Sequence, residues 1–190
     1  GISASPDKTD LWITGIEHFY CVNTSTMRLP KVYRLSDVVA ECEIGQWYLA
    51  SPIFWMRKRP FVFVARSKQF WDAEFHVCEL RIKNSRLISG KLGKPLFVDV
   101  DRPMPGVVAM EASSIGAFGA THHIFFGIDS NAHKCQVTQI PQEYKNRSII
   151  QAFSTGQTGV AASINWEGKL VLWVIPQLMN LPSAVPVASR

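Results

Sequence analysis

The stretch that decides the fold of this chain runs from Ala120 to Leu178. It contains three segments, ATHHIFFGI at 120–128, CQVTQIPQEY at 135–144 and GVAASINWEGKLVLWVIP at 159–176. Short apolar runs rich in β-branched and aromatic residues, separated by turn-forming residues, are typical of successive antiparallel strands. Asn165–Gly168 is predicted to be a hairpin link, in which the glycine supplies the positive φ of a tight turn.

The closing strand of this stretch is apolar on both of its faces. We expect Leu170, Leu172, Trp173 and Ile175 to be core or interface residues. A strand without polar alternation is covered on both sides, either by its own domain or by a neighbouring subunit. The pattern therefore predicts a β-sandwich suited to assembly.

Outward from this stretch, the composition is that of an ordered globular protein. Of the 190 residues, 47% are hydrophobic and 18% are charged, and one domain is the expectation for this length. We predict an extended N-terminal arm over 1–10, one domain over 11–178 and an extended tail over 179–190. The net charge of +5 is compatible with an anionic partner but is also ordinary for a soluble domain.

The pattern predicts about eight strands with short helices in the links between them. One helix is expected after a Ser36–Asp37 cap and another over Ser67–Ala73, whereas 107–120 is expected to be a long loop. Parallel strands are usually connected by helices that cross over the sheet, and the expected helices are too few and too short for this. We therefore predict an all-β fold, an eight-stranded antiparallel β-sandwich of the jelly-roll type.

The four cysteines, Cys21, Cys42, Cys78 and Cys135, are widely spaced and form no Cys-x-x-Cys pair. This spacing favours free thiols in a reducing compartment over a disulfide framework. The N-terminus has no apolar signal core, and no apolar run approaches the roughly 20 residues of a membrane helix. We accordingly expect no membrane insertion.

Candidate catalytic or metal-binding residues gather at His122, His123, Asp129, His133 and Cys135. A metal site needs ligands that converge on one point, and adjacent strand residues such as the two histidines point to opposite faces. A loop with incidental polar residues is the favoured interpretation. No nucleophile elbow, Walker loop or dinucleotide fingerprint is present. We predict no enzyme activity and no cofactor.

The basic residues are concentrated at Arg57, Lys58 and Arg59, which the aromatic residues Trp55 and Phe61 flank. Aromatic and cationic side chains together can stack on bases and neutralise phosphates. A solvated loop is the favoured alternative to this possible RNA contact.

Four segments resemble parts of picornavirus-like capsid proteins in their order and spacing over residues 32–178. They are Ser36–Gln46, Trp71–Ile82, Val137–Tyr144 and Gly168–Pro176. Among such viruses, the small size is similar to that of the smaller coat proteins of the plant secovirus group. A leading Gly1 is also expected for a coat protein that a protease releases from a polyprotein.

This resemblance implies a jelly-roll coat subunit of a non-enveloped icosahedral virion, assembled in the host cytoplasm. Its expected partners are other coat-protein chains and genomic single-stranded RNA, bound without sequence preference. The alternative is a stand-alone β-sandwich module that binds a ligand or a carbohydrate. A hydrolase using the region from His123 to Asp129 is a third hypothesis.

Overall fold

The computed structural model describes residues 1–27, 30–69, 72–100, 105–112, 116–140, 148–154, 158–164, 170–176 and 185–189. The chain divides into two compact units, Gly1–Met104 and Pro105–Arg190. The single domain expected over 11–178 stays a prediction.

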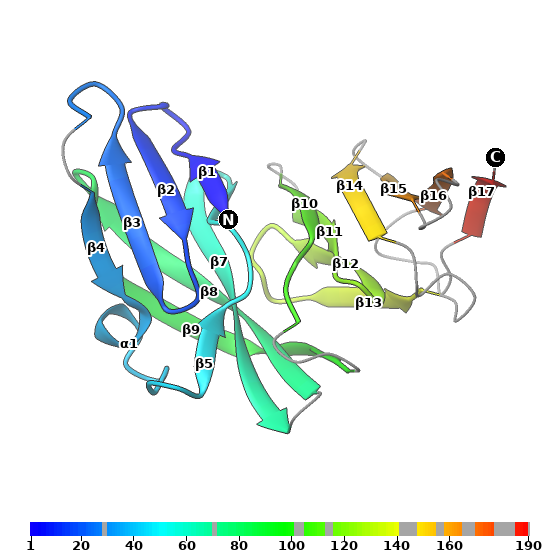
Figure 1. Ribbon diagram of the computed structural model, residues 1–190, viewed down its shortest axis with the longest axis horizontal. Helices are drawn as coiled ribbons and strands as arrows, with labels where there is room; N and C mark the ends of the chain where they lie inside the picture. Colours follow the sequence, from blue (N-terminus) through cyan, green and yellow to red (C-terminus); the bar gives the residue numbers. More distant parts are fainter. Residues whose placement is uncertain are drawn as a thin grey trace. The chain divides into compact units, whose positions relative to one another are not determined.

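The first sheet of unit 1 is a four-stranded antiparallel meander, in which each strand pairs with the next along the chain (Figure 1). Its strands are β1 (Ile2–Ala4), β2 (Asp10–Thr14), β3 (His18–Asn23) and β4 (Lys31–Arg34). Part of the expected N-terminal arm thus forms β1, the edge strand of this sheet. Helix α1 (Leu35–Val38) follows β4.

The second sheet of unit 1 has the order β5–β7–β8–β9, and β6 also pairs with β7. Its strands are β5 (Trp47–Leu49), β6 (Phe54–Met56), β7 (Arg59–Gln69), β8 (Asp72–Lys83) and β9 (Arg86–Asp99). β5 and β6 pair with opposite ends of β7, so they replace one strand that is interrupted around Pro52. Proline explains the interruption because it cannot donate a ladder hydrogen bond.

The core of unit 1 lies between these two sheets and α1. Trp12 and Phe19 of the first sheet belong to the same buried cluster as Val62, Val64 and Leu80 of the second sheet. On β7, Phe61 and Phe63 alternate with these valines and point to the other face of the sheet. There they join a second aromatic cluster, with Phe63 and Phe75 ring centroids 6.3 Å apart. The central part of β7 is thus apolar on both faces.

Unit 2 contains two further antiparallel meanders. The third sheet consists of β10 (Ala109–Ala112), β11 (Gly116–Ala120), β12 (Ile124–Asp129) and β13 (Cys135–Gln139). The fourth sheet consists of β14 (Ser148–Ser154), β15 (Thr158–Ile164), β16 (Leu170–Pro176) and β17 (Val185–Ser189). Aromatic residues join the two sheets, since the ring centroids of Phe125 and Trp173 are 5.5 Å apart.

The all-β prediction is confirmed, because the described residues form several antiparallel sheets and one short helix. A jelly-roll sandwich is not shown. A Greek key returns a strand through a long connection to lie beside an earlier one. In each of the four described sheets, the strand order instead follows the order along the chain. Four-stranded meanders of this kind are also the units that β-propellers repeat.

Several expectations for individual elements are wrong. The chain has more strands than the expected eight, because polar and glycine-rich segments such as Arg86–Gly93 also pair as strands. The expected loop over 107–120 contains β10 and β11, which pair from Ala109↔Ala120 to Ala112↔Ala117. Small residues are weak strand formers, so this pairing depends on the neighbouring strand β12 and not on local preference.

The two expected helices also differ from the structure. α1 begins at Leu35 and has Arg34 as its N-cap, with no capping hydrogen bond from a side chain. Ser36 therefore lies inside the helix. In Ser67–Ala73 the described residues belong to β7 and β8, which pair at Ser67↔Ala73 and Gln69↔Asp72, so this link is a hairpin. Residues 70–71 and the hairpin link 165–168 lie outside the described ranges, although β15 and β16 pair on either side of the latter.

All four cysteines are free, as expected. Cys21, Cys42 and Cys78 are buried, and burial raises the pKa of the Cys21 thiol to about 11 and that of Cys42 to about 12. No helix among the described residues has the length and apolar character needed to cross a membrane.

Candidate functional site

A pocket of about 670 Å³ lies in unit 1, where turns from three segments of the chain meet. Its volume falls in the range of about 300–1,000 Å³ that is usual for ligand pockets. The lining comes from the β1–β2 loop, the β6–β7 hairpin and the β8–β9 hairpin, together with strand residues beneath them. The lining residues are Ser5, Pro6, Asp7, Thr9, Asp10, Trp12, Trp55, Lys58, Pro60, Ile82, Asn84 and Ser85.

The β1–β2 loop is held in shape by its own hydrogen bonds. Asp7 Oδ1 accepts hydrogen bonds from Ser5 Oγ at 2.6 Å, from Thr9 Oγ1 at 2.9 Å and from the Thr9 amide at 3.2 Å. The Asp10 amide donates to Ser5 Oγ at 3.0 Å. These contacts tie both ends of the loop to the Asp7 carboxylate, so the carboxylate has a defined position at the pocket.

The other two turns are two-residue hairpin links. Arg57 and Lys58 have φ of 49° and 62° between the paired residues Met56 and Arg59. Asn84 and Ser85 have φ of 51° and 57° between the paired residues Lys83 and Arg86. Positive φ at both central residues is the requirement of a type I′ turn, whose twist matches that of the flanking strands. The pocket is therefore lined by short turns that are anchored on paired strands.

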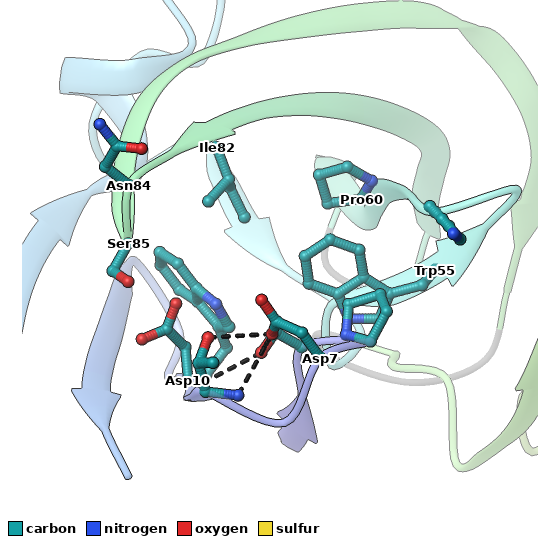
Figure 2. Close-up of a pocket in the computed structure, with 12 residues that line it drawn as sticks. Asp7, Asp10, Trp55, Pro60, Ile82, Asn84 and Ser85 are labelled. Carbon is teal, nitrogen blue, oxygen red and sulfur yellow. Dashed lines mark hydrogen bonds between the residues drawn. The ribbon is translucent and has the colours of Figure 1, made fainter. Parts of the chain in front are cut away.

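The lining combines apolar walls with charged and polar groups (Figure 2). Figure 2 shows Trp55 and Pro60 on one side of the pocket, Ile82, Asn84 and Ser85 on the other, and the two aspartates below them. Trp55, Pro60 and Ile82 are half-buried, whereas Asp7, Lys58 and Asn84 are exposed. A ligand in the pocket can thus contact apolar surface as well as hydrogen-bond donors and acceptors.

Two indole nitrogens at the pocket lack a hydrogen-bond partner. The Nε1 atoms of Trp12 and Trp55 are covered from solvent and have no acceptor among the described residues. Trp12 is fully buried and is one of the residues that line the pocket. An unpaired buried donor costs about 1–3 kcal/mol relative to a paired one. An acceptor that reached either nitrogen would remove this cost.

The two aspartates of the pocket lie in different environments. Hydrogen bonds from Ser5 and then from Thr9 hold the pKa of the exposed Asp7 carboxylate below its ordinary value of 3.8. Asp10 is only 5% exposed, and its Oδ1 accepts a hydrogen bond from Asn23 Nδ2 at 3.3 Å. The charge of Asp10 also contributes, after burial, to the raised pKa of Cys21. Both aspartates supply acceptor oxygens, and Lys58 supplies a hydrogen-bond donor.

The basic residues suspected of RNA contact lie at the β6–β7 turn but do not act as one cluster. Arg59 forms a bidentate ion pair with Glu79, with Nε to Oε1 at 2.8 Å and Nη2 to Oε2 at 2.5 Å. Its guanidinium also lies 5.3 Å from the centroid of the Phe61 ring. Arg57 and Lys58 are exposed, and Lys58 lines the pocket.

The histidine-rich segment of unit 2 is a structured turn. Asp129 Oδ1 accepts hydrogen bonds from the amides of His133 at 2.7 Å and Lys134 at 2.8 Å, so this carboxylate organises the β12–β13 turn. His123 is buried and Cys135 is half-buried. No group of three or more His, Cys, Asp or Glu side chains within the described ranges is placed to hold a metal ion.

The residues of the closing strand divide between two environments. Trp173 is 1% exposed and Val171 is 0% exposed, whereas Leu170 and Leu172 are 43% and 40% exposed. One face of β16 is therefore buried in unit 2, and its other face presents half-exposed leucines. The side chain of Ile175 lies outside the described ones.

Sequence reasoning missed the pocket. Asp7, Trp55 and Asn84 are far apart along the chain and form no motif, so only the pairing of the strands brings them together. The one local signal was Asn84–Ser85 between two alternating runs, because asparagine tolerates the positive φ of a hairpin turn.

No protein-family model and no curated protein matches this chain. Among solved structures, the chain is similar to the crystal structure of the WD40 domain of SCAP from fission yeast. The identity is 8% and the TM-score is 0.44, and the match covers 100% of this chain and 41% of that chain. A likeness at this level does not establish a shared fold.

Proposed function

We propose that this chain is a ligand-binding β-sheet module whose binding site is the unit 1 pocket. The observation that carries the proposal is the pocket's construction, in which the half-buried Trp55 of β6, Asp7 of the β1–β2 loop and Asp10 of β2 line one cavity together with the turns of two further hairpins. Ligand pockets typically combine apolar walls with a few well-placed polar groups. Turns on a framework of paired strands are a common place for binding residues, because the framework fixes their positions.

The test uses the indole N–H signals of the full-length chain. The protein has six tryptophans, whose ¹H–¹⁵N signals can be assigned with single Trp→Phe variants. We expect that members of a soluble fragment library shift the signals of Trp12 and Trp55 in a saturable way and leave that of Trp173 in place. A library that shifts neither pocket signal, or shifts all six together, contradicts the proposal.

A coat-protein subunit is the second candidate, and the apolar outer face of β16 is the observation that favours it. Leu170 and Leu172 are half-exposed beside the buried Trp173. Contact between subunits removes such apolar surface from water, and closed symmetry multiplies each contact. The resemblance to picornavirus-like capsid proteins supports the same function. This second proposal includes a jelly-roll arrangement and a location in the virion. It also includes related coat chains as partners and RNA contact through Arg57, Lys58 and Arg59.

Particle formation tests the second candidate. Electron microscopy and light scattering of the chain, purified from cells that also express its polyprotein partners, should show spherical particles containing RNA. Replacing Arg57 and Lys58 with Gln should lower the RNA content, because phosphate contact depends on surface charge. A stable monomer in native buffer at every concentration tested would count against this function.

A further inference from the structure

We infer that the ligand class of the unit 1 pocket is a saccharide of one to three rings, bound through its hydroxyl groups and one ring face. The inference rests on the proposed ligand-binding function and deepens it. It follows from the types of side chain that line the pocket and from their positions on the three turns.

Donors and acceptors are both present around the pocket. Asp7 and Asp10 offer carboxylate oxygens, Lys58 and Asn84 offer N–H groups, and Ser85 offers a hydroxyl. A sugar hydroxyl donates one hydrogen bond and accepts others, so it can pair with both kinds of group. The two carboxylates repel an anion, and the ammonium of Lys58 partly offsets the attraction that they offer a cation. A neutral polyhydroxylated molecule is subject to neither effect.

The half-buried Trp55 supplies the surface that such a molecule also needs. One face of a pyranose ring consists mainly of C–H groups, and an indole offers a flat apolar face of similar width together with an N–H donor. Pro60 and Ile82 extend this apolar surface. Figure 2 shows Asp7 below Trp55 and Pro60 and Asp10 across the pocket on the side of Ser85, so ring packing on the indole and hydroxyl binding to a carboxylate can take place together.

The two unpaired indole nitrogens can report on ligand binding, because both tryptophans line the pocket. Trp12 Nε1 and Trp55 Nε1 are buried at the pocket without an acceptor among the described residues. Because both nitrogens are covered in the free chain, a ligand hydroxyl accepts a hydrogen bond from either of them only if the covering side chains move. Binding should therefore move these two indole signals more than any other tryptophan signal.

The experiment titrates the full chain with four disaccharides, namely maltose, cellobiose, lactose and N,N′-diacetylchitobiose, while the tryptophan indole signals are recorded. Tetramethylammonium chloride and sodium phosphate serve as cationic and anionic probes. We expect saturable shifts of the Trp55 and Trp12 signals with at least one disaccharide and none with either salt. Trp55→Phe keeps an apolar ring, loses the N–H donor and should weaken binding several-fold.

Asp7→Asn tests the polar contacts, because the amide oxygen can still accept the loop hydrogen bonds from Ser5 and Thr9. It should weaken disaccharide binding about tenfold, the effect of weakening one hydrogen bond to a charged group. Asp37→Asn is the matched control, since Asp37 is exposed in α1 and is not part of the pocket lining. It should bind as the parent protein does.

The possible failures are distinguishable. If no disaccharide binds while a fragment or one of the salts shifts the pocket signals, the saccharide inference is overturned and the ligand-binding function stands. If no molecule of any class shifts these signals, both are overturned. Disaccharide binding that Asp7→Asn and Trp55→Phe leave unchanged also overturns the inference, because the sugar is then held elsewhere.

Discussion

At the residue scale, Trp173 is the side chain on which unit 2 depends most clearly. It is 1% exposed in the middle of β16, and its ring lies 5.5 Å from that of Phe125 in the other sheet. Trp173→Ala should lower the free energy of unfolding by about 3–5 kcal/mol, because it removes a large buried side chain and leaves a cavity. That loss is a large part of a typical stability of about 5–15 kcal/mol.

Urea unfolding followed by circular dichroism measures this loss. Leu172→Ala is the matched control, because it shortens the neighbouring side chain that is 40% exposed. It should cost about 1 kcal/mol or less. Equal effects of the two substitutions would show that Trp173 is not a core residue.

The stability that the β1–β2 loop gives the folded chain should depend on pH through the Asp7 carboxylate. Its pKa in the folded chain is held below the ordinary value of 3.8 by hydrogen bonds from Ser5 and Thr9. The stabilisation is therefore complete above the unfolded pKa and is lost as the pH falls through the lower, folded pKa. A carboxyl-carbon NMR titration should give a midpoint below 3.8. The Asp7→Asn variant should lack this part of the loss of stability in acid. A midpoint at or above 3.8 for Asp7 in the parent protein would contradict the prediction.

At the scale of the elements, the β8–β9 hairpin has a turn whose sequence can be improved. Asn84 and Ser85 both have positive φ, and asparagine followed by glycine is a preferred pair for such a turn. Ser85→Gly should stabilise unit 1 by about 0.5–1 kcal/mol, because glycine adopts this conformation without a Cβ clash. Thermal unfolding measures the effect. The control Ser89→Gly, at an exposed position within β9, should be destabilising.

The β11–β12 pair depends on a close approach at Gly116. A Cβ added there would lie 2.2 Å from the Ile128 carbonyl oxygen, which belongs to the backbone of the paired strand. Gly116→Ala should therefore cost about 1–3 kcal/mol or more, since the strands must separate to accommodate the methyl group. Hydrogen exchange of the β11 and β12 amides should become faster. The control Gly15→Ala should have little effect, because its Cβ would lie 3.6 Å from the nearest atom.

At the scale of the whole molecule, the outer face of β16 should govern self-association. Leu170 and Leu172 lie on this face, and Val171 and Trp173 lie on the buried face. The double substitution Leu170→Lys and Leu172→Lys adds two charges to the outer face without changing the core. Light scattering should show a lower mass at high protein concentration, and the melting temperature should change little. If the parent protein associates and the double variant has the same mass, the contact between chains does not involve the outer face of β16.

The sequence alone determined that this chain is all-β, because short runs of β-branched and aromatic residues with turn signals between them report a local preference for strands. The free cysteines and the turn around Asp129 followed from spacing and side-chain type. Each of these features depends on neighbouring residues, so local reasoning reached it.

Only the tertiary structure decided how the strands pair and what they enclose. β10 and β11 are rich in small residues with little strand preference, and the pairing of β11 with β10 on one side and with β12 on the other outweighs that preference. Asp7, Trp55 and Asn84 meet at one pocket because three hairpins end on the same side of unit 1. Alternation within a strand tells which side chains share a face but not which strand lies beside it. The pocket depends on that non-local choice.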